Sequence, residues 1–136
     1  MFDIDSEYDL WLQEQADLLR QNRFEELDIK NLIEELEALV RGEKSAVESL
    51  TINILTHLMY CQFWEEQQRA KRHWQAEITN FRYQLENKLS TNLKNHLVNN
   101  WDNLLKKAIK LANIKTGLQI TAEYTLEQVL DQDFLP

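Results

Sequence analysis

Apolar residues recur along most of the chain at the three- and four-residue spacing of an α-helix. The first such stripe predicts a helix over about residues 6–22. Ser6 and Asp9 are expected to form a capping box at its start. Its apolar face contains Tyr8, Trp11, Leu12, Leu18 and Leu19. A short turn is expected over residues 24–27, and Asp28 is the predicted N-cap of the next helix.

The second stripe is the longest and runs from residue 28 to residue 63. It comprises Ile29, Leu32, Ile33, Leu36, Leu39 and Val40 before Gly42, and Val47, Leu50, Ile54, Leu58 and Cys61 after it. Because the apolar phase continues across Gly42, we expect one long helix, although a glycine costs about 1 kcal/mol in a helix interior. An unbroken helix would be about 54 Å long. Either it bends near Gly42, or its exposed end packs on a partner.

The remaining stripes predict two further helices and a short helical turn. Residues 64–73 are polar and indicate a connection or a frayed helix start, after which a stripe begins at Trp74 and ends at Leu89. Ser90 or Thr91 caps a helix that continues to Gly117. Thr125 and Gln128 form a second capping box near the end. The predicted fold is all-α: one domain over residues 1–136, an antiparallel bundle of four principal helices with a long second helix and a short C-terminal helical turn.

Composition supports this fold class and narrows the cellular setting. The chain has 2 Gly and 1 Pro, too few for the tight turns of an all-β or doubly wound fold. The single Cys61 excludes an internal disulfide and a cysteine-based zinc site, and it fits a reducing compartment. No apolar run is long enough to span a membrane, and the N-terminus lacks the pattern of a signal peptide. We therefore expect a cytoplasmic protein without a membrane partner.

Charge is unevenly distributed along the chain, whose net charge is −8. Residues 1–50 carry 14 Asp and Glu against 5 Lys and Arg, whereas residues 51–100 carry 4 against 6. The acidic half and the weakly basic middle could attract each other, within one bundle or between two copies. The simpler alternative is that solvated helix faces are acidic. Overall acidity argues against non-specific binding of nucleic acid, which needs clustered cations.

Catalytic and metal-binding motifs are absent from the pattern. The residues three positions before His57, His73 and His96 are not carboxylates, so the Glu-x-x-His motif of carboxylate-bridged metal centres is missing. His57 and Cys61 lie four residues apart on one helix face, as an incomplete pair of metal ligands or a thiolate–imidazole pair. A buried cysteine beside a hydrogen-bonded histidine is the simpler interpretation. We predict no metal, cofactor, small-molecule ligand or catalytic residue.

A basic group interleaved with aromatic residues follows the long stripe. It consists of Arg69, Lys71, Arg72, His73 and Arg82, with Trp64, Trp74 and Tyr83 between them. Such a pattern can bind single-stranded nucleic acid or an acidic protein. The simpler explanation is that these cations lie at the C-terminal end of a helix, where its dipole favours them, with Trp74 in the core. The candidate contact residues for a ligand or partner are His57, Cys61, Arg69, Arg72 and His73.

Four segments together resemble a known family. They are Trp11–Ala16 with Leu18–Arg20, Arg23–Asp28 running into Asn31–Glu37, His57-Leu58, and Tyr124–Asp131 with the ending Phe134-Leu135-Pro136. Over essentially the whole chain, this sequence is similar to the bacterial domain-of-unknown-function family numbered twenty-nine, small proteins abundant in photosynthetic bacteria. The resemblance implies a helical, standalone intracellular domain, and it brings no catalytic residue. The chain departs from it by lacking proline after His57 and by a short stretch before Tyr124.

These observations favour a non-enzymatic interaction module, homodimeric or one half of a two-protein system. Its expected partner is a protein, either a second copy or the product of a neighbouring gene. The alternative is a small toxin, effector or antitoxin-like protein that acts on RNA or a nucleotide, with His57, Arg69, Arg72 and His73 in contact or proton-transfer roles. Two apolar residues in the terminal tripeptide indicate that this end docks, on this bundle or on another chain.

Overall fold

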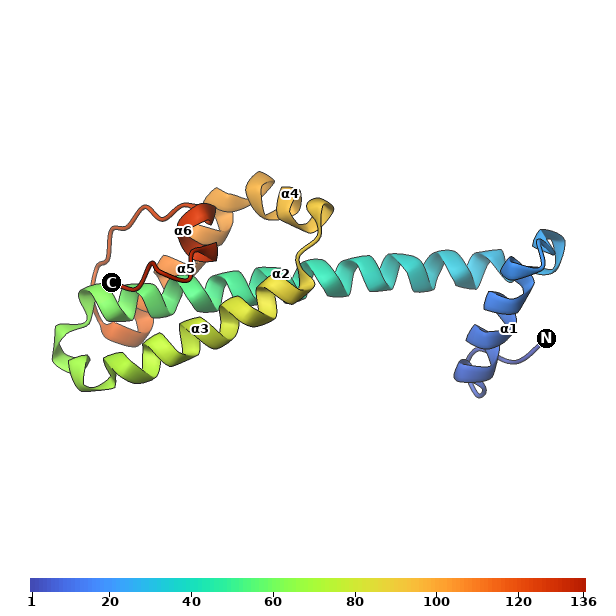
Figure 1. Ribbon diagram of the computed structural model, residues 1–136, viewed down its shortest axis with the longest axis horizontal. Helices are drawn as coiled ribbons and strands as arrows, with labels where there is room; N and C mark the ends of the chain where they lie inside the picture. The colour runs from blue at the N-terminus through green and yellow to red at the C-terminus, as the bar shows by residue number, and fades with distance from the viewer. The chain divides into compact units, whose positions relative to one another are not determined.

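A computed structural model describes all 136 residues and contains helices only (Figure 1). The α-helices are α1 (Tyr8–Arg20), α2 (Ile29–Phe63), α3 (Lys71–Lys88), α4 (Thr91–Asn99), α5 (Trp101–Thr116) and α6 (Leu126–Leu130). Two 3₁₀ helices, η1 (Phe24–Glu26) and η2 (Glu65–Ala70), connect them. The predicted all-α class is confirmed, and none of the helices is long and apolar enough to cross a bilayer.

The chain divides into two compact units, Met1–Arg41 and Gly42–Pro136. Helix α2 belongs to both, because it is helical on either side of Gly42 and at Gly42 itself. This confirms one long helix from residue 29 to residue 63. The expectation of a single domain over residues 1–136 stays a prediction, and each unit is described by itself below.

In the unit Met1–Arg41, α1 and the start of α2 are joined by a polar network around Asp28. The Trp11 Nε1 donates a hydrogen bond to Asp28 Oδ2 at 3.0 Å, and the Asp28 backbone N–H donates to Gln15 Oε1 at 2.8 Å. Hydrogen bonds from Asn31 and Trp11 lower the pKa of the Asp28 carboxyl group. Asp28 thus occupies the predicted capping position. Only two large apolar side chains, Trp11 and Leu18, are buried in this unit.

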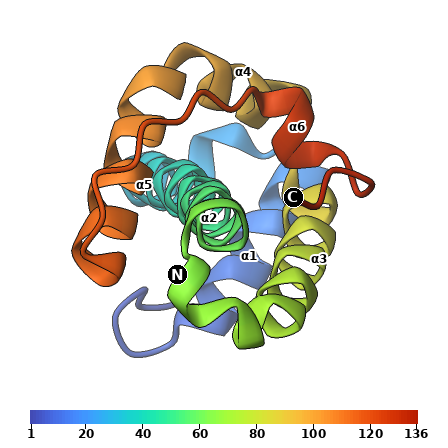
Figure 2. The same cartoon turned by 90° about the vertical axis from the view of Figure 1, so that its left-hand side faces the viewer.

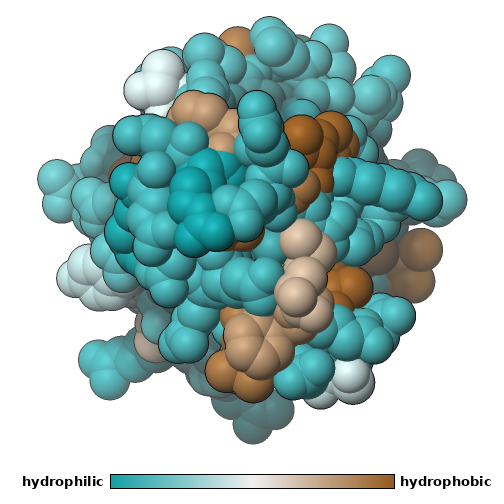
Figure 3. All heavy atoms as spheres, turned by 90° about the vertical axis from the view of Figure 1, so that its right-hand side faces the viewer, coloured by the Kyte–Doolittle hydropathy of each residue, from teal (hydrophilic) through white to brown (hydrophobic).

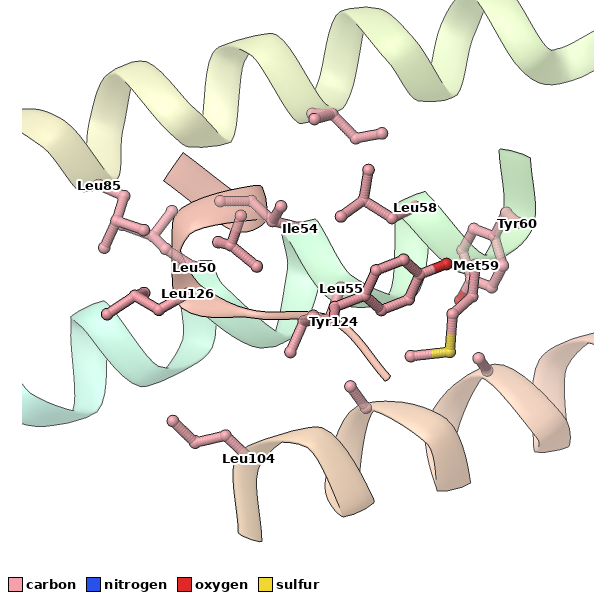
Figure 4. Packing of buried hydrophobic residues seen from close by; sticks show 14 of the residues in the cluster. Leu50, Ile54, Leu55, Leu58, Met59, Tyr60, Leu85, Leu104, Tyr124 and Leu126 are labelled. Carbon is pink, nitrogen blue, oxygen red and sulfur yellow. The ribbon is translucent and has the colours of Figure 1, made fainter. Parts of the chain in front are cut away.

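The unit Gly42–Pro136 contains the hydrophobic core. Figure 2 shows α3, α4, α5 and α6 arranged around the C-terminal part of α2. The second half of the α2 stripe supplies Leu50, Ile54, Leu55 and Leu58, all buried. Leu85 from α3, Leu104 from α5, and Tyr124 and Leu126 from the last segment complete the same cluster (Figure 4).

Arg82 fixes the C-terminal segment to this core, a role that the sequence did not indicate. Its side chain is buried, and it donates hydrogen bonds to the carbonyl oxygens of Val129 (2.7 Å), Gln128 (3.0 Å) and Phe134 (2.8 Å). Burial lowers the pKa of this guanidinium, and the nearby Asp131 opposes the effect. Phe134 also packs edge-on against Tyr124. The terminal tripeptide therefore docks through Phe134 on its own bundle.

Two local predictions were wrong. Helix α1 has Glu7 at its N-cap without a side-chain cap, so Ser6 and Asp9 form no capping box. The reason is a turn before the helix, in which the Glu7 backbone N–H donates to Asp3 O at 2.8 Å. The helix predicted from residue 90 to 117 is divided into α4 and α5 at Asn100. The Asn100 side chain donates to His96 O at 2.8 Å and thereby competes with helical pairing.

Three predicted helix ends are confirmed, namely the starts of α4 and α6 and the end of α5. The Ser90 hydroxyl accepts from the Leu93 N–H at the start of α4, and Thr125 with Gln128 forms a capping box at α6. Gly117 ends α5 with a positive φ of 75°. The polar stretch before α3 is the 3₁₀ helix η2, which fits the predicted connection, although α3 begins at Lys71, before the first residue of its apolar stripe.

Gly42→Ala is expected to stabilise the protein. A Cβ added at Gly42 meets no atom within 4 Å, and alanine is favoured over glycine in a helix by about 1 kcal/mol. Urea unfolding should show this increase in the free energy of unfolding. Gly117→Ala is the control, because the left-handed conformation there should make alanine destabilising by roughly 1–2 kcal/mol. A destabilised Gly42→Ala variant would contradict a regular helix at this position.

Arg82→Met is expected to lower the free energy of unfolding by about 2–4 kcal/mol, because buried carbonyl oxygens of the C-terminal segment lose their donors. The matched control is Arg72→Met, since Arg72 is exposed and the change should stay within about 0.5 kcal/mol. Hydrogen exchange should also become faster in residues 126–134 in the Arg82 variant alone. Equal stability of the two variants would show that the Arg82 contacts contribute little.

Candidate functional site

His57 lies on α2 in a partly buried position, with one ring nitrogen engaged and the other free. Its Nδ1 is 2.6 Å from the carbonyl oxygen of Asn53, one turn earlier on the same helix. Because a carbonyl oxygen only accepts hydrogen bonds, Nδ1 carries the proton. In the neutral ring Nε2 then keeps its lone pair, and no hydrogen bond within the protein reaches it.

Aromatic rings from α2 and α3 surround this histidine. The His57 ring centroid is 5.2 Å from that of Tyr60 and 5.3 Å from that of Phe81. Tyr60 in turn packs against Trp64 and Trp74, whose rings stack on each other at 5.5 Å with an interplanar angle of 8°. The Lys115 Nζ lies 5.2 Å above the Tyr60 ring, in cation–π contact. Trp64, which the sequence placed in a polar connection, is therefore part of this cluster.

The surroundings of His57 favour its neutral form. Burial lowers the pKa of the ring, and the positive charge of Lys115 and the proximity of His73 act in the same direction. The hydrogen bond to Asn53 and the charge of Glu77 oppose them. A neutral imidazole with an unpaired Nε2 can accept a hydrogen bond or a proton. The structure provides no second group in hydrogen-bond contact with Nε2 to complete a proton relay.

Cys61 does not form a reactive pair with His57. It is buried, and burial raises the pKa of its thiol, against a smaller opposing effect of Lys71. Its neighbour is Tyr124, whose pKa is also raised by burial and whose hydroxyl donates to Gln62 Oε1 at 2.6 Å. No hydrogen bond joins Cys61 to His57. The thiol stays protonated at neutral pH, as expected of a small hydrophobic core residue.

The three other predicted contact residues lie at the surface. Arg69 lies in the last turn of η2, and Arg72 and His73 lie in the first turn of α3, all with exposed side chains. Neither arginine forms a salt bridge. Only His73 is near enough to His57 to influence its charge. Of the five predicted residues, the structure therefore brings His73 near His57. Cys61, Arg69 and Arg72 form no hydrogen bond with the His57 ring. No three His, Cys, Asp or Glu side chains group closely enough to hold a metal ion.

Within the unit Met1–Arg41, the first half of the predicted α2 stripe forms an apolar ridge that no other element of the unit covers. We define the ridge as Ile29, Ile33, Leu36 and Val40, which are 58, 50, 60 and 49% exposed. Their spacing of four, three and four residues puts them on one face of α2. Helical periodicity predicts such a face, but it carries no information about whether another element covers it. In this unit α1 contacts the neighbouring face instead, where Tyr8 donates to Glu35 Oε2 at 2.6 Å.

Stability should depend on pH through His57. Because the pKa of the folded state is below the ordinary histidine value of 6.5, the unfolded chain binds the proton first as the pH falls. This part of the stability is complete above pH 6.5 and is lost as the pH falls through the lowered pKa. We expect the destabilisation caused by His57→Asn to be smaller at pH about 5 than at pH about 7.5. Urea titrations of both proteins measure it, and a constant difference would contradict the burial of His57.

Comparison with known proteins identifies the chain over nearly its whole length. The family described as "Domain of unknown function DUF29" matches residues 4–135. No curated protein and no solved structure matches. The matched region includes both compact units and all the candidate contact residues. The resemblance seen in the sequence is confirmed: this chain belongs to the DUF29 family.

Proposed function

We propose that this protein is a non-enzymatic helical interaction module, which binds another protein chain through the unit Met1–Arg41. The observation that carries the proposal is the exposed ridge on α2. Twelve large apolar side chains of this unit are exposed, whereas only Trp11 and Leu18 are buried. Chains of about 40 residues rarely fold without additional support. A second protein surface on the ridge would supply that support.

Covering the ridge would contribute several kcal/mol to the stability of a unit of about 40 residues. Full burial of an aliphatic side chain contributes about 1.5–3 kcal/mol, so hiding the exposed half of each ridge residue contributes roughly 1 kcal/mol. Four such residues together contribute roughly 4 kcal/mol, which is comparable to the hydrogen bonds around Asp28. Figure 3 shows apolar side chains in brown at the surface among hydrophilic ones in teal. An apolar helix face that no other element covers is typical of interaction sites.

The alternative of an effector acting on RNA or a nucleotide has less support. It requires His57, Arg69, Arg72 and His73 to act together on one substrate. Arg69 and Arg72 form no contact with His57, and His57 has no partner for proton transfer. The buried Cys61 is not positioned as a nucleophile. This alternative stays a prediction, and the interaction module is the function that the geometry favours.

The test is a ridge variant, Ile33→Lys with Leu36→Lys. Two buried charges would oppose any packing on the ridge, while the exposed positions leave the fold of the unit intact. Light scattering at tens of micromolar should give the wild type the mass of an assembly, either by itself or when it is co-purified with the product of a neighbouring gene. The variant should have the mass of a monomer in both preparations.

The matched control is Tyr83→Lys with Val98→Lys, which changes exposed apolar residues of α3 and α4. This control should assemble like the wild type. A monomeric wild type in both preparations, or equal behaviour of the ridge variant and the control, would refute the proposal.

A further inference from the structure

We propose that the partner is a second copy of this chain, and that the ridge of one copy packs into a basic groove on α5 of the other. This inference rests on the proposed function and names its partner. The groove is a shallow surface depression lined by Lys106, Ile109, Lys110, Asn113 and Ile114. It is distinct from the His57 cluster.

The α5 groove combines an apolar floor with a cationic rim. Ile109 and Ile114 provide apolar surface, and Ile114 is 72% exposed. Lys106 and Lys110 lie one turn apart on the rim. Lysine stems add further apolar surface while their ammonium groups remain in water. The groove is therefore suited to an apolar helix that carries negative charge.

The charge of the two units matches this arrangement. Residues 1–41 hold 12 Asp and Glu against 4 Lys and Arg, whereas residues 42–136 hold 11 of each. The whole net charge of −8 thus belongs to the unit with the ridge. Helix α5 has four lysines and one aspartate. An acidic unit and a basic helix attract each other before contact, and this attraction selects their orientation.

The row of side chains beside the ridge offers the groove both carboxylates and cations. It consists of Lys30, Glu34, Glu37 and Arg41, at the same spacing as the ridge. Leu36, Glu37, Val40 and Arg41 line a second shallow depression. Within this row Arg41 lies 3.9 Å from Glu37. Glu34 forms no salt bridge in the chain. It is thus free to pair with a lysine of the rim.

The dimensions of the two surfaces are also compatible. Ile29 to Val40 span about 16 Å of α2, and Lys106 to Ile114 span about 12 Å of α5. Ridges formed by residues four apart pack into grooves of the same kind on a facing helix. Each chain has one ridge and one groove. In a two-fold dimer, each ridge would pack in the groove of the other copy, so that both surfaces would be covered at once.

Direct pairing of two ridges is the main competing arrangement. It would bring together two units that each carry an excess of eight negative charges. Like charges across an interface are unfavourable, and Lys30 and Arg41 beside the ridge offset only part of this excess. Packing on the α5 of a second copy avoids this repulsion. The charge distribution therefore favours the exchanged arrangement over ridge pairing.

The test uses two charge-reversed full-length chains. The first is Glu34→Lys with Glu37→Lys, and the second is Lys106→Glu with Lys110→Glu. All four side chains are exposed, so both chains should fold like the wild type, which circular dichroism checks. Light scattering at tens of micromolar and low salt should show a dimeric wild type and two monomeric variants. An equimolar mixture should restore the dimer, because each acidic surface then meets a basic one.

The outcomes separate this inference from the proposed function. The dimer could persist in the variant Lys106→Glu with Lys110→Glu and be lost in the ridge variant Ile33→Lys with Leu36→Lys. That result would overturn the α5 groove as the binding site of the ridge, and the ridge would remain an interaction surface. A monomeric wild type that binds a neighbouring gene product through the ridge would also overturn the second copy as partner. Two monomeric variants that stay monomeric in the mixture would contradict the charge pairing itself.

Discussion

The apolar stripe of α2 runs through both units, and whether other elements of the chain cover it decides how each unit is built. In Gly42–Pro136 the stripe is covered, because α3, α5 and the last segment close over Leu50, Ile54 and Leu58. In Met1–Arg41 the same stripe continues in phase, yet α1 leaves the ridge uncovered. One continuous helix therefore joins a unit with a completed core to a unit without one.

The unit Met1–Arg41 is held by polar contacts where a core would ordinarily be. Trp11 is buried, but its indole N–H is committed to Asp28, which is also the cap of α2. Gln15 accepts from the Asp28 backbone while its own Nε2 is buried without a partner. Such a network specifies how α1 meets α2 more than it stabilises them, because unpaired buried donors are costly. The polar network therefore fixes how α1 packs on α2, and it leaves the ridge on α2 exposed.

Most of the helical framework could be predicted from the sequence, because periodicity and caps are local signals. The continuity of α2, the caps at Ser90 and Thr125, and the end of α5 at Gly117 all depend on neighbours within one turn. The break at Asn100 is also local, but the apolar residues continue across it and hide it. The role of Arg82 could not be predicted, since an arginine between Phe81 and Tyr83 gives no sign that it will donate to carbonyl oxygens some 46 residues away.

The candidate site shows why the reactivity of a side chain cannot be predicted from residue spacing. It depends on tertiary contacts, which the spacing of residues in the sequence does not specify. His57 and Cys61 share a helix face in the sequence, but their side chains have different neighbours, the aromatic cluster for one and Tyr124 for the other. Burial is the largest cause of the shifted pKa values of both, and neither is tuned by a partner positioned for catalysis. Perturbed groups of this kind are what a packed core produces. The remaining distinctive features lie on the surface, in the exposed apolar face of α2 and in the negative charge of Met1–Arg41.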